Sequence, residues 1–107
     1  MIRLLKKLLF VLPLFWGLQL FAQTIVVCSD CKINSLKEAI TNAVAGDTIL
    51  VKKGTYKEYN IVVDKPLTIK GKNFPVIDGE DQGEIIRVVS DNVTIDGLFI
   101  INVGTSY

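Results

Sequence analysis

The sequence is poor in the residue types that build most catalytic and metal sites. It has no histidine, two cysteines, one methionine and one tryptophan among 107 residues. No nucleophile elbow and no glycine-rich phosphate loop occurs along it. A closed metal site usually takes four ligands, so two cysteines without a histidine cannot complete one in this segment. The remaining candidates for chemistry are the two cysteines and scattered carboxylates.

The chain also lacks an excess of either charge. Its 12 basic and 11 acidic residues give a net charge of +1. Residues 1–22 hold three of the basic residues and none of the acidic ones, so the rest of the chain has nine basic against 11 acidic residues, a net charge of −2. Nucleic-acid-binding domains carry a basic surface. The charge balance therefore argues against a nucleic-acid partner.

The longest apolar run lies at the N-terminus. Residues 8–21 are almost wholly apolar, follow three basic residues, and lead to Ala22, a small residue at a plausible cleavage site. This is the order of a secretory signal peptide. The run is short for a membrane span, which needs about 20 residues. We predict a signal peptide over residues 1–22, cleaved after Ala22, and an exported protein; an uncleaved membrane anchor is the alternative.

A lead-in over residues 23–34 contains both cysteines and precedes a predicted helix over residues 35–46. Ser35 and Glu38 form an S-x-x-E capping box, in which each side chain can bond to the other's free backbone N–H. One apolar stripe follows at helical spacing. It comprises Leu36, Ala39, Ile40, Ala43 and Val44. Gly46 stands where a left-handed C-terminal cap belongs. Because the helix is short, burial of the stripe must stabilise it.

Short β-branched runs separated by turn residues fill residues 47–107, which indicates an all-β architecture. Residues 62–71 align without gaps to residues 88–97, at an offset of 26. A period in the twenties is typical of one solenoid coil, in which equivalent residues stack as parallel strands. We therefore predict a right-handed parallel β-helix. Leu67 and Ile69 should point inward beneath Val93 and Ile95. A β-sandwich also has short strands, but it does not predict this repeat.

The predicted helix then has a role as the cap of the first coil, whose apolar end would otherwise be open. No matching cap is predicted at the other end. Tyr107 follows directly on a strand-like run and leaves an unpaired edge. We expect the β-helix to be incomplete at its C-terminus and the chain to be a fragment of a longer protein.

Several runs of the sequence resemble a known family. The N-terminal runs SLKEAI (35–40), AGDTI (45–49) and KGTY (53–56) are similar to the entry of many secreted β-helix proteins. The runs DKPLTIKG (64–71), PVIDG (75–79), DNVTIDG (91–97) and NVGTSY (102–107) together resemble the NosD family, the periplasmic β-helix maturation factors of nitrous oxide reductase. The resemblance covers residues 35–107.

The resemblance implies a non-catalytic role in assembling a copper centre in the periplasm. It also implies nitrous oxide reductase and an ABC transporter that handles sulfur or copper as partners. Composition and spacing do not show this role. The alternative is a polysaccharide-acting β-helix enzyme of the lyase or epimerase type, because a fold does not fix a function. Lys70 and Asp96 occupy equivalent positions of the repeat, and a structural pair across coils is the expected reading of them.

The sequence C-x-x-C at Cys28 and Cys31 is the main candidate site. A local disulfide is the leading interpretation, because an exported compartment is oxidising. The second is a thiolate site for Cu(I) or zinc, which would need ligands from elsewhere. The third is a thiol pair that exchanges with a partner. A thioredoxin-type motif is disfavoured, because no βαβ pattern surrounds it.

Two weaker candidates lie in the predicted coils. Asp78, Glu80, Asp81 and Glu84 could supply oxygen ligands to Ca²⁺, but their spacing matches no calcium loop and favours a solvated turn. Tyr56 and Tyr59 could stack against a sugar, or they could pack beside the first coil.

Overall fold

The structure, a computed structural model, describes residues 21–105. The predicted signal peptide falls almost wholly on residues 1–20, which lie outside the described residues, as do residues 106–107. The described elements are β1 (Thr24–Val27), α2 (Leu36–Asn42), β2 (Thr48–Val51), β3 (Thr55–Lys57), β4 (Ile61–Val63), β5 (Thr68–Gly71), β6 (Val76–Asp78), β7 (Ile86–Val88), β8 (Thr94–Asp96) and β9 (Phe99–Ile101). The helix among them is far too short to cross a membrane, and no other described helix is a candidate span.

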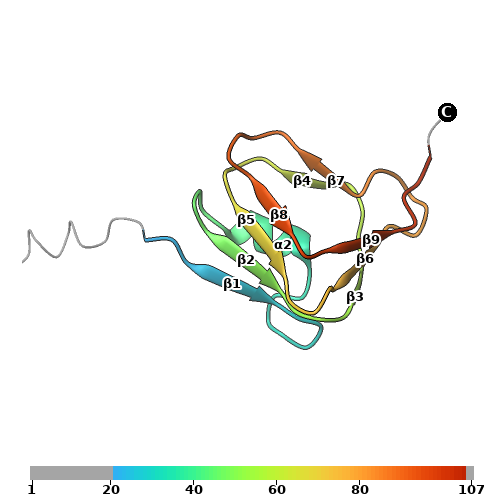
Figure 1. The fold of residues 1–107 in the computed structure, drawn as a ribbon, viewed down its shortest axis with the longest axis horizontal. Coiled ribbons are helices and arrows are strands. Elements are labelled where there is room, and N and C mark those ends of the chain that lie inside the picture. The colour runs from blue at the N-terminus through green and yellow to red at the C-terminus, as the bar shows by residue number, and fades with distance from the viewer. Residues whose placement is uncertain (1–20, 106–107) are drawn as a thin grey trace, which may run out of the picture.

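The strands form three parallel stacks. One sheet has the order β1-β2-β5-β8, the second β3-β6-β9, and the third β4-β7. Every pairing within these sheets is parallel. Between β2 and β5, and again between β5 and β8, the chain passes through one strand of each of the other two stacks. Figure 1 shows the stacks as the sides of a roughly triangular coil. The molecule is therefore a parallel β-helix, as the repeat predicts.

Alternation of side chains explains why such short runs form strands. In β2, Ile49 and Val51 are buried, and the residues beside them are half-buried. Ile49 pairs with Ile69 in the first stack, and Tyr56 pairs with Ile77 in the second. All five side chains belong to one buried core. Burying one isoleucine contributes about 1.5–3 kcal/mol. These stacked apolar pairs therefore supply much of the free energy that holds successive coils together.

The predicted register holds for β5 and β8. Ile69 pairs with Ile95, at the offset of 26. The gapless alignment is wrong one strand earlier, because Val63 pairs with Val88 instead of Val89. The chain takes one residue more between β7 and β8 than between β4 and β5. Sequence similarity hides this shift, because Val88 and Val89 are the same residue type.

The glycines that end the two repeats lie against each other. A Cβ on Gly71 would clash with the carbonyl oxygen of Gly97 and would lie 2.7 Å from Cδ of Pro75. Gly97 also has a φ of +79°, in the left-handed region that favours glycine. Close approach of two turn backbones therefore explains why both repeats place glycine here.

Burial declines in the last described coil. Ile95, Ile100 and Val88 are 37%, 41% and 47% exposed, although their pairing partners one coil earlier are fully buried. Within residues 21–105, no strand pairs with the outer edges of β7, β8 and β9. The inward side chains of this coil are therefore covered from one side only.

Helix α2 covers the opposite end of the coils, as predicted. It contacts β1, β2 and β4, and in Figure 1 it lies behind the strand stacks. Leu36, Ala39 and Ile40 are buried, as is Ala43 just after the helix. The predicted extent over residues 35–46 is wrong at the C-terminal end, because the helix stops at Asn42 and Ala43 is already extended. Val44 lies beyond it and is exposed.

The predicted glycine cap is also wrong, and two side chains explain why the helix stops early. Nζ of Lys65 donates to the carbonyl oxygens of Ile40 and Ala43 at 2.9 and 2.8 Å. A carboxylate oxygen of Asp47 accepts from the backbone N–H of Val44 at 3.0 Å. Gly46 has a φ of +96°, but it belongs to the turn into β2.

The predicted lead-in over residues 23–34 needs a correction as well. Its first part is β1, which pairs with β2 along its whole length. Val27, at the end of β1, is fully buried in the common core. The solenoid therefore begins at Thr24 and not at residue 47. The apolar run Thr24–Val27 before Cys28 has the composition of a strand. It stands apart from the other strand-like runs in the sequence, because the helix lies between them.

Candidate functional site

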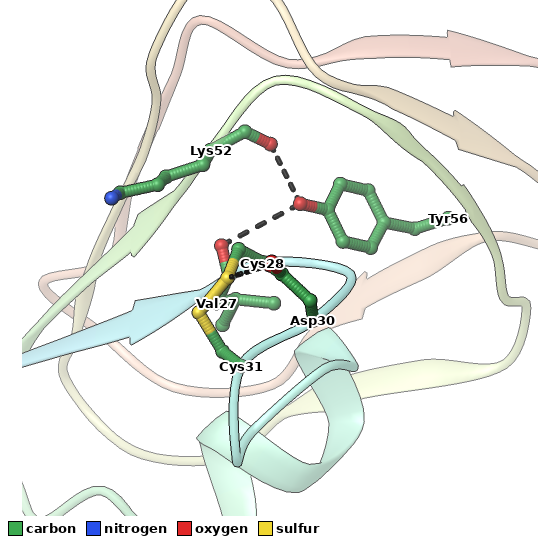
Figure 2. The surroundings of a disulfide bond; sticks show 6 residues. All are labelled: Val27, Cys28, Asp30, Cys31, Lys52 and Tyr56. Atoms are coloured by element: carbon green, nitrogen blue, oxygen red, sulfur yellow. Dashed lines mark hydrogen bonds between the residues drawn. A yellow bond between two sulfur atoms is a disulfide. The ribbon is translucent and has the colours of Figure 1, made fainter.

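The two cysteines lie in a tight turn where β1 ends. The backbone N–H of Cys31 donates to the carbonyl oxygen of Cys28 at 3.2 Å, and that of Cys28 donates to Ile33 at 3.4 Å. The turn brings the two Cα atoms to 5.0 Å, and the side chains form a disulfide. Figure 2 shows this bond at the end of β1, on the loop that leads to α2. Both cysteines are half-buried, so the sulfurs are close to solvent.

Asp30 lies between the cysteines and turns its carboxylate back toward them. Its Oδ1 is 3.1 Å from Sγ of Cys28 (Figure 2). A sulfur in a disulfide has no proton to donate, so this contact can become a hydrogen bond only after reduction. One ligand atom from each of Cys28, Asp30 and Cys31 lies within 4.8 Å of the other two. Our sequence interpretation missed Asp30, although it stands inside the C-x-x-C motif.

The side chain of Tyr56 packs next to the cysteine turn. Its hydroxyl donates to the carbonyl oxygen of Lys52 at 2.7 Å and lies 3.5 Å from that of Val27 (Figure 2). Burial raises the pKa of Tyr56 above its ordinary value of 10.0, and the charges of Glu58 and Asp30 raise it further. The phenol therefore keeps its proton and joins the end of β1 to the turn after β2.

A surface hollow of about 310 Å³ opens beside the cysteine turn. Its walls come from the turn itself, from the start of α2 and from β3. Among its lining residues are Ser29, Asn34, Ser35, Thr55 and Lys57. Hydroxyl, amide and ammonium groups of this kind can hydrogen-bond, while apolar atoms make up more of the exposed lining. The surface beside the disulfide is therefore mixed in character.

The buried carboxylate of Glu58 holds the start of α2 against this hollow. Its two oxygens accept the backbone N–H groups of Leu36 and Lys37 at 2.6 and 3.0 Å. Ser35 also accepts from the backbone of Glu38, which confirms that half of the predicted capping box. The carboxylate that serves the first turn is Glu58 and not Glu38. Sequence gave no sign of this, because Glu58 is 20 or more residues away.

The structure separates the other predicted candidates. Among residues 21–105, the cysteine turn is the one place where three metal-ligating side chains converge, so the acidic residues Asp78, Glu80, Asp81 and Glu84 do not form such a cluster. Asp78 instead accepts from the backbone of Glu80 and from Nδ2 of Asn102, both at 2.9 Å. These bonds, with that of Asn102 first, lower the pKa of Asp78. They fix a turn between adjacent coils.

Tyr56 is only 5% exposed, so its ring packs in the core and is not available to stack against a sugar. Tyr59 is half-buried, and Nζ of Lys37 lies 5.4 Å from the centre of its ring.

Lys70 and Asp96 are neighbours in the β5–β8 register, as predicted. The ion pair formed in the described part of the chain is a different one, between Arg87 and Glu84 within one turn.

Comparison with known protein families, with curated proteins and with solved structures found no match. The geometry of the cysteine turn and the fold that carries it are therefore the basis for the functional argument.

Proposed function

We propose that this protein is an exported accessory factor that assists assembly of the copper centre of nitrous oxide reductase and catalyses no reaction itself. Its task is to carry Cu(I) on the reduced Cys28 and Cys31 pair and to release it to the reductase. The observation that carries the proposal is the convergence of the two sulfurs at an accessible turn of a β-helix. The resemblance of residues 35–107 to the NosD family supplies the copper centre, the reductase and the ABC transporter as the context.

Thiolates are soft ligands, and Cu(I) is a soft ion that they select. Two sulfurs from one short turn hold such an ion without enclosing it, because a closed structural site takes four ligands. An open two-sulfur site suits transfer, since an acceptor can add its own ligands before the donor releases the ion. The hollow beside the turn, with its mixed polar and apolar lining, gives an acceptor a surface to contact.

The proposed location is the periplasm, reached through the predicted signal peptide. That compartment favours the disulfide, so copper carriage requires a reductant of the dithiol class. In the reaction, the disulfide takes up two electrons and two protons and becomes two thiols, while the dithiol becomes a disulfide. Cu(I) then displaces the thiol protons to solvent.

The test is a Cu(I) titration of the reduced protein in competition with a chromophoric chelator. The parent should bind one Cu(I) per chain, and both Cys28→Ser and Cys31→Ser should abolish this binding. The oxidised parent is the matched control, because it has the same sequence with the sulfurs blocked. Identical binding by the parent and both serine variants would refute copper carriage by this turn.

A further inference from the structure

The cysteine turn contains a third donor that Cu(I) carriage does not need. We infer that the reduced turn also binds a divalent thiophilic cation of the zinc class, with Asp30 as the third ligand, and that the disulfide is the form that excludes the ion. The inference rests on the proposed function in one respect, that the cysteine pair becomes reduced.

The geometry of the turn fits such an ion. Zinc is held at about 2.3 Å by sulfur and about 2.0–2.2 Å by carboxylate oxygen, in tetrahedral sites. Neighbouring ligand atoms of such a site are therefore about 3.3–3.8 Å apart. In the turn, all three donor atoms lie within 4.8 Å of one another, and Oδ1 of Asp30 is 3.1 Å from Sγ of Cys28. Opening of the sulfur–sulfur bond is the main change that the site needs, and reduction supplies it.

No local structural role accounts for the direction of the Asp30 carboxylate. Aspartates in turns commonly accept a backbone N–H and so stabilise the turn. Within residues 21–105 the Asp30 carboxylate accepts no such bond, and the close polar contact that it makes is with Cys28. The side chain is exposed, so solvent could separate the two groups at little cost. Its position therefore points to the sulfurs as its working partner.

Charge explains how reduction would switch the site. In the disulfide form, Asp30 supplies the one negative charge. A dithiol donor delivers two electrons and two protons and becomes a disulfide, and the turn then has two thiols. When the cation binds, both thiol protons leave for solvent and three anionic donors surround the ion. A divalent ion neutralises two of these charges and keeps a fourth position for water, whereas Cu(I) neutralises one and is satisfied by two sulfurs.

The experiment compares the full-length parent with Asp30→Asn and with Asp91→Asn. Asp91 is an exposed aspartate of the last described coil, so its variant controls for the loss of one negative charge. Each protein is reduced with a dithiol, freed of it without air, and titrated with Zn(II) against a chromophoric chelator. A parallel titration uses Cu(I). The oxidised parent is titrated as well.

We expect Asp30→Asn to weaken Zn(II) binding by about tenfold or more, as loss of a metal-site carboxylate does, and to leave Cu(I) binding unchanged. Asp91→Asn should change neither, and the oxidised parent should bind no Zn(II). Equal Zn(II) binding by the parent and Asp30→Asn, or Zn(II) binding by the disulfide form, would overturn the inference. Cu(I) binding without an Asp30 effect on Zn(II) would leave the proposed function standing, whereas Zn(II) binding without Cu(I) binding would refute that function alone.

Discussion

At the scale of single residues, buried carboxylates join segments that are distant in sequence. Asp47 is 2% exposed, and its two oxygens accept the backbone N–H groups of Gln23 and Val44 at 2.9 and 3.0 Å. It therefore joins the chain before β1 to the chain after α2. Buried polar groups of this kind are stabilising only when both oxygens are satisfied. Asp47 meets that condition.

The protonation of Asp47 gives the first prediction. The backbone bonds from Val44 and then Gln23 lower its pKa below the ordinary 3.8, and burial opposes them. Because the folded pKa is the lower one, the stabilisation is fully present above the unfolded value and is lost as the pH falls through the folded value. The free energy of unfolding, measured in urea, should hold from neutrality to about pH 5 and fall below that.

Asp47→Asn separates this residue from the other carboxylates. An amide offers one acceptor oxygen where the carboxylate offers two, so one backbone N–H loses its partner. The variant should be about 1–3 kcal/mol less stable at neutral pH and should lose less stability on acidification. Asp64→Asn, at an exposed position, is the control. Equal stability of Asp47→Asn and the parent at pH 7 would show that the two hydrogen bonds to Asp47 contribute nothing to stability.

At the scale of elements, α2 combines a covered apolar face with charges at both ends. The carboxylate of Glu58 meets its N-terminus and the ammonium of Lys65 meets its C-terminus, in the arrangement that the helix dipole favours. Both side chains come from coil segments below the helix. A helix of seven residues is unstable alone, so its contacts with the coils hold it in place.

Replacement of Ile40 by aspartate tests whether α2 is the cap. Ile40 is 5% exposed, and an unpaired charge at its position would have to be buried or would force the helix off the coils. We expect a loss of several kcal/mol in a urea unfolding experiment. Thr41→Asp, at the next and exposed position of the same helix, introduces the same charge and should cost little. Similar unfolding curves for the two variants would contradict the capping role.

The helix also shows what sequence can and cannot predict. Spacing of Leu36, Ala39 and Ile40 identified the buried face, because that pattern is local. The end of the helix was placed too late, since it depends on Asp47 and Lys65, which act through tertiary contacts. Asp30 was missed for a different reason. Its role as a candidate ligand depends on its carboxylate pointing toward Cys28, and the sequence does not show where a side chain points.

At the scale of the whole molecule, the repeat predicted the architecture because stacking makes equivalent residues neighbours. One offset of 26 sufficed to predict parallel strands, yet the observed pairings range from 20 residues between β2 and β5 to 26 between β5 and β8. Turn lengths vary from coil to coil, and the stacked apolar pairs bring each strand back into register with the strand one coil earlier. The repeat was visible in the sequence for the β5–β8 pair, whose strands and closing glycines are alike, and not for the other pairs.

Engineered crosslinks test this register. Thr68 and Thr94 are direct partners on β5 and β8, and adjacent strands lie about 4.8 Å apart. Cysteines at these positions fall within the range of about 4.4–6.8 Å that a disulfide needs. In a background of Cys28→Ser and Cys31→Ser, the double variant should oxidise readily. A pair at Thr68 and Asp96, about 8 Å apart, should not. Faster oxidation of that second pair would contradict the parallel register.

We propose that the cysteine turn of this β-helix delivers copper to an acceptor, and a transfer assay would test this claim on the two proteins together. Protein loaded with Cu(I) would be mixed with copper-free nitrous oxide reductase, and formation of the copper centre would be followed by its visible absorbance. We expect faster formation than from a Cu(I) chelate buffered at the same free Cu(I), and loss of this advantage in Cys28→Ser and Cys31→Ser. Equal rates for the loaded protein and the chelate would contradict the claim.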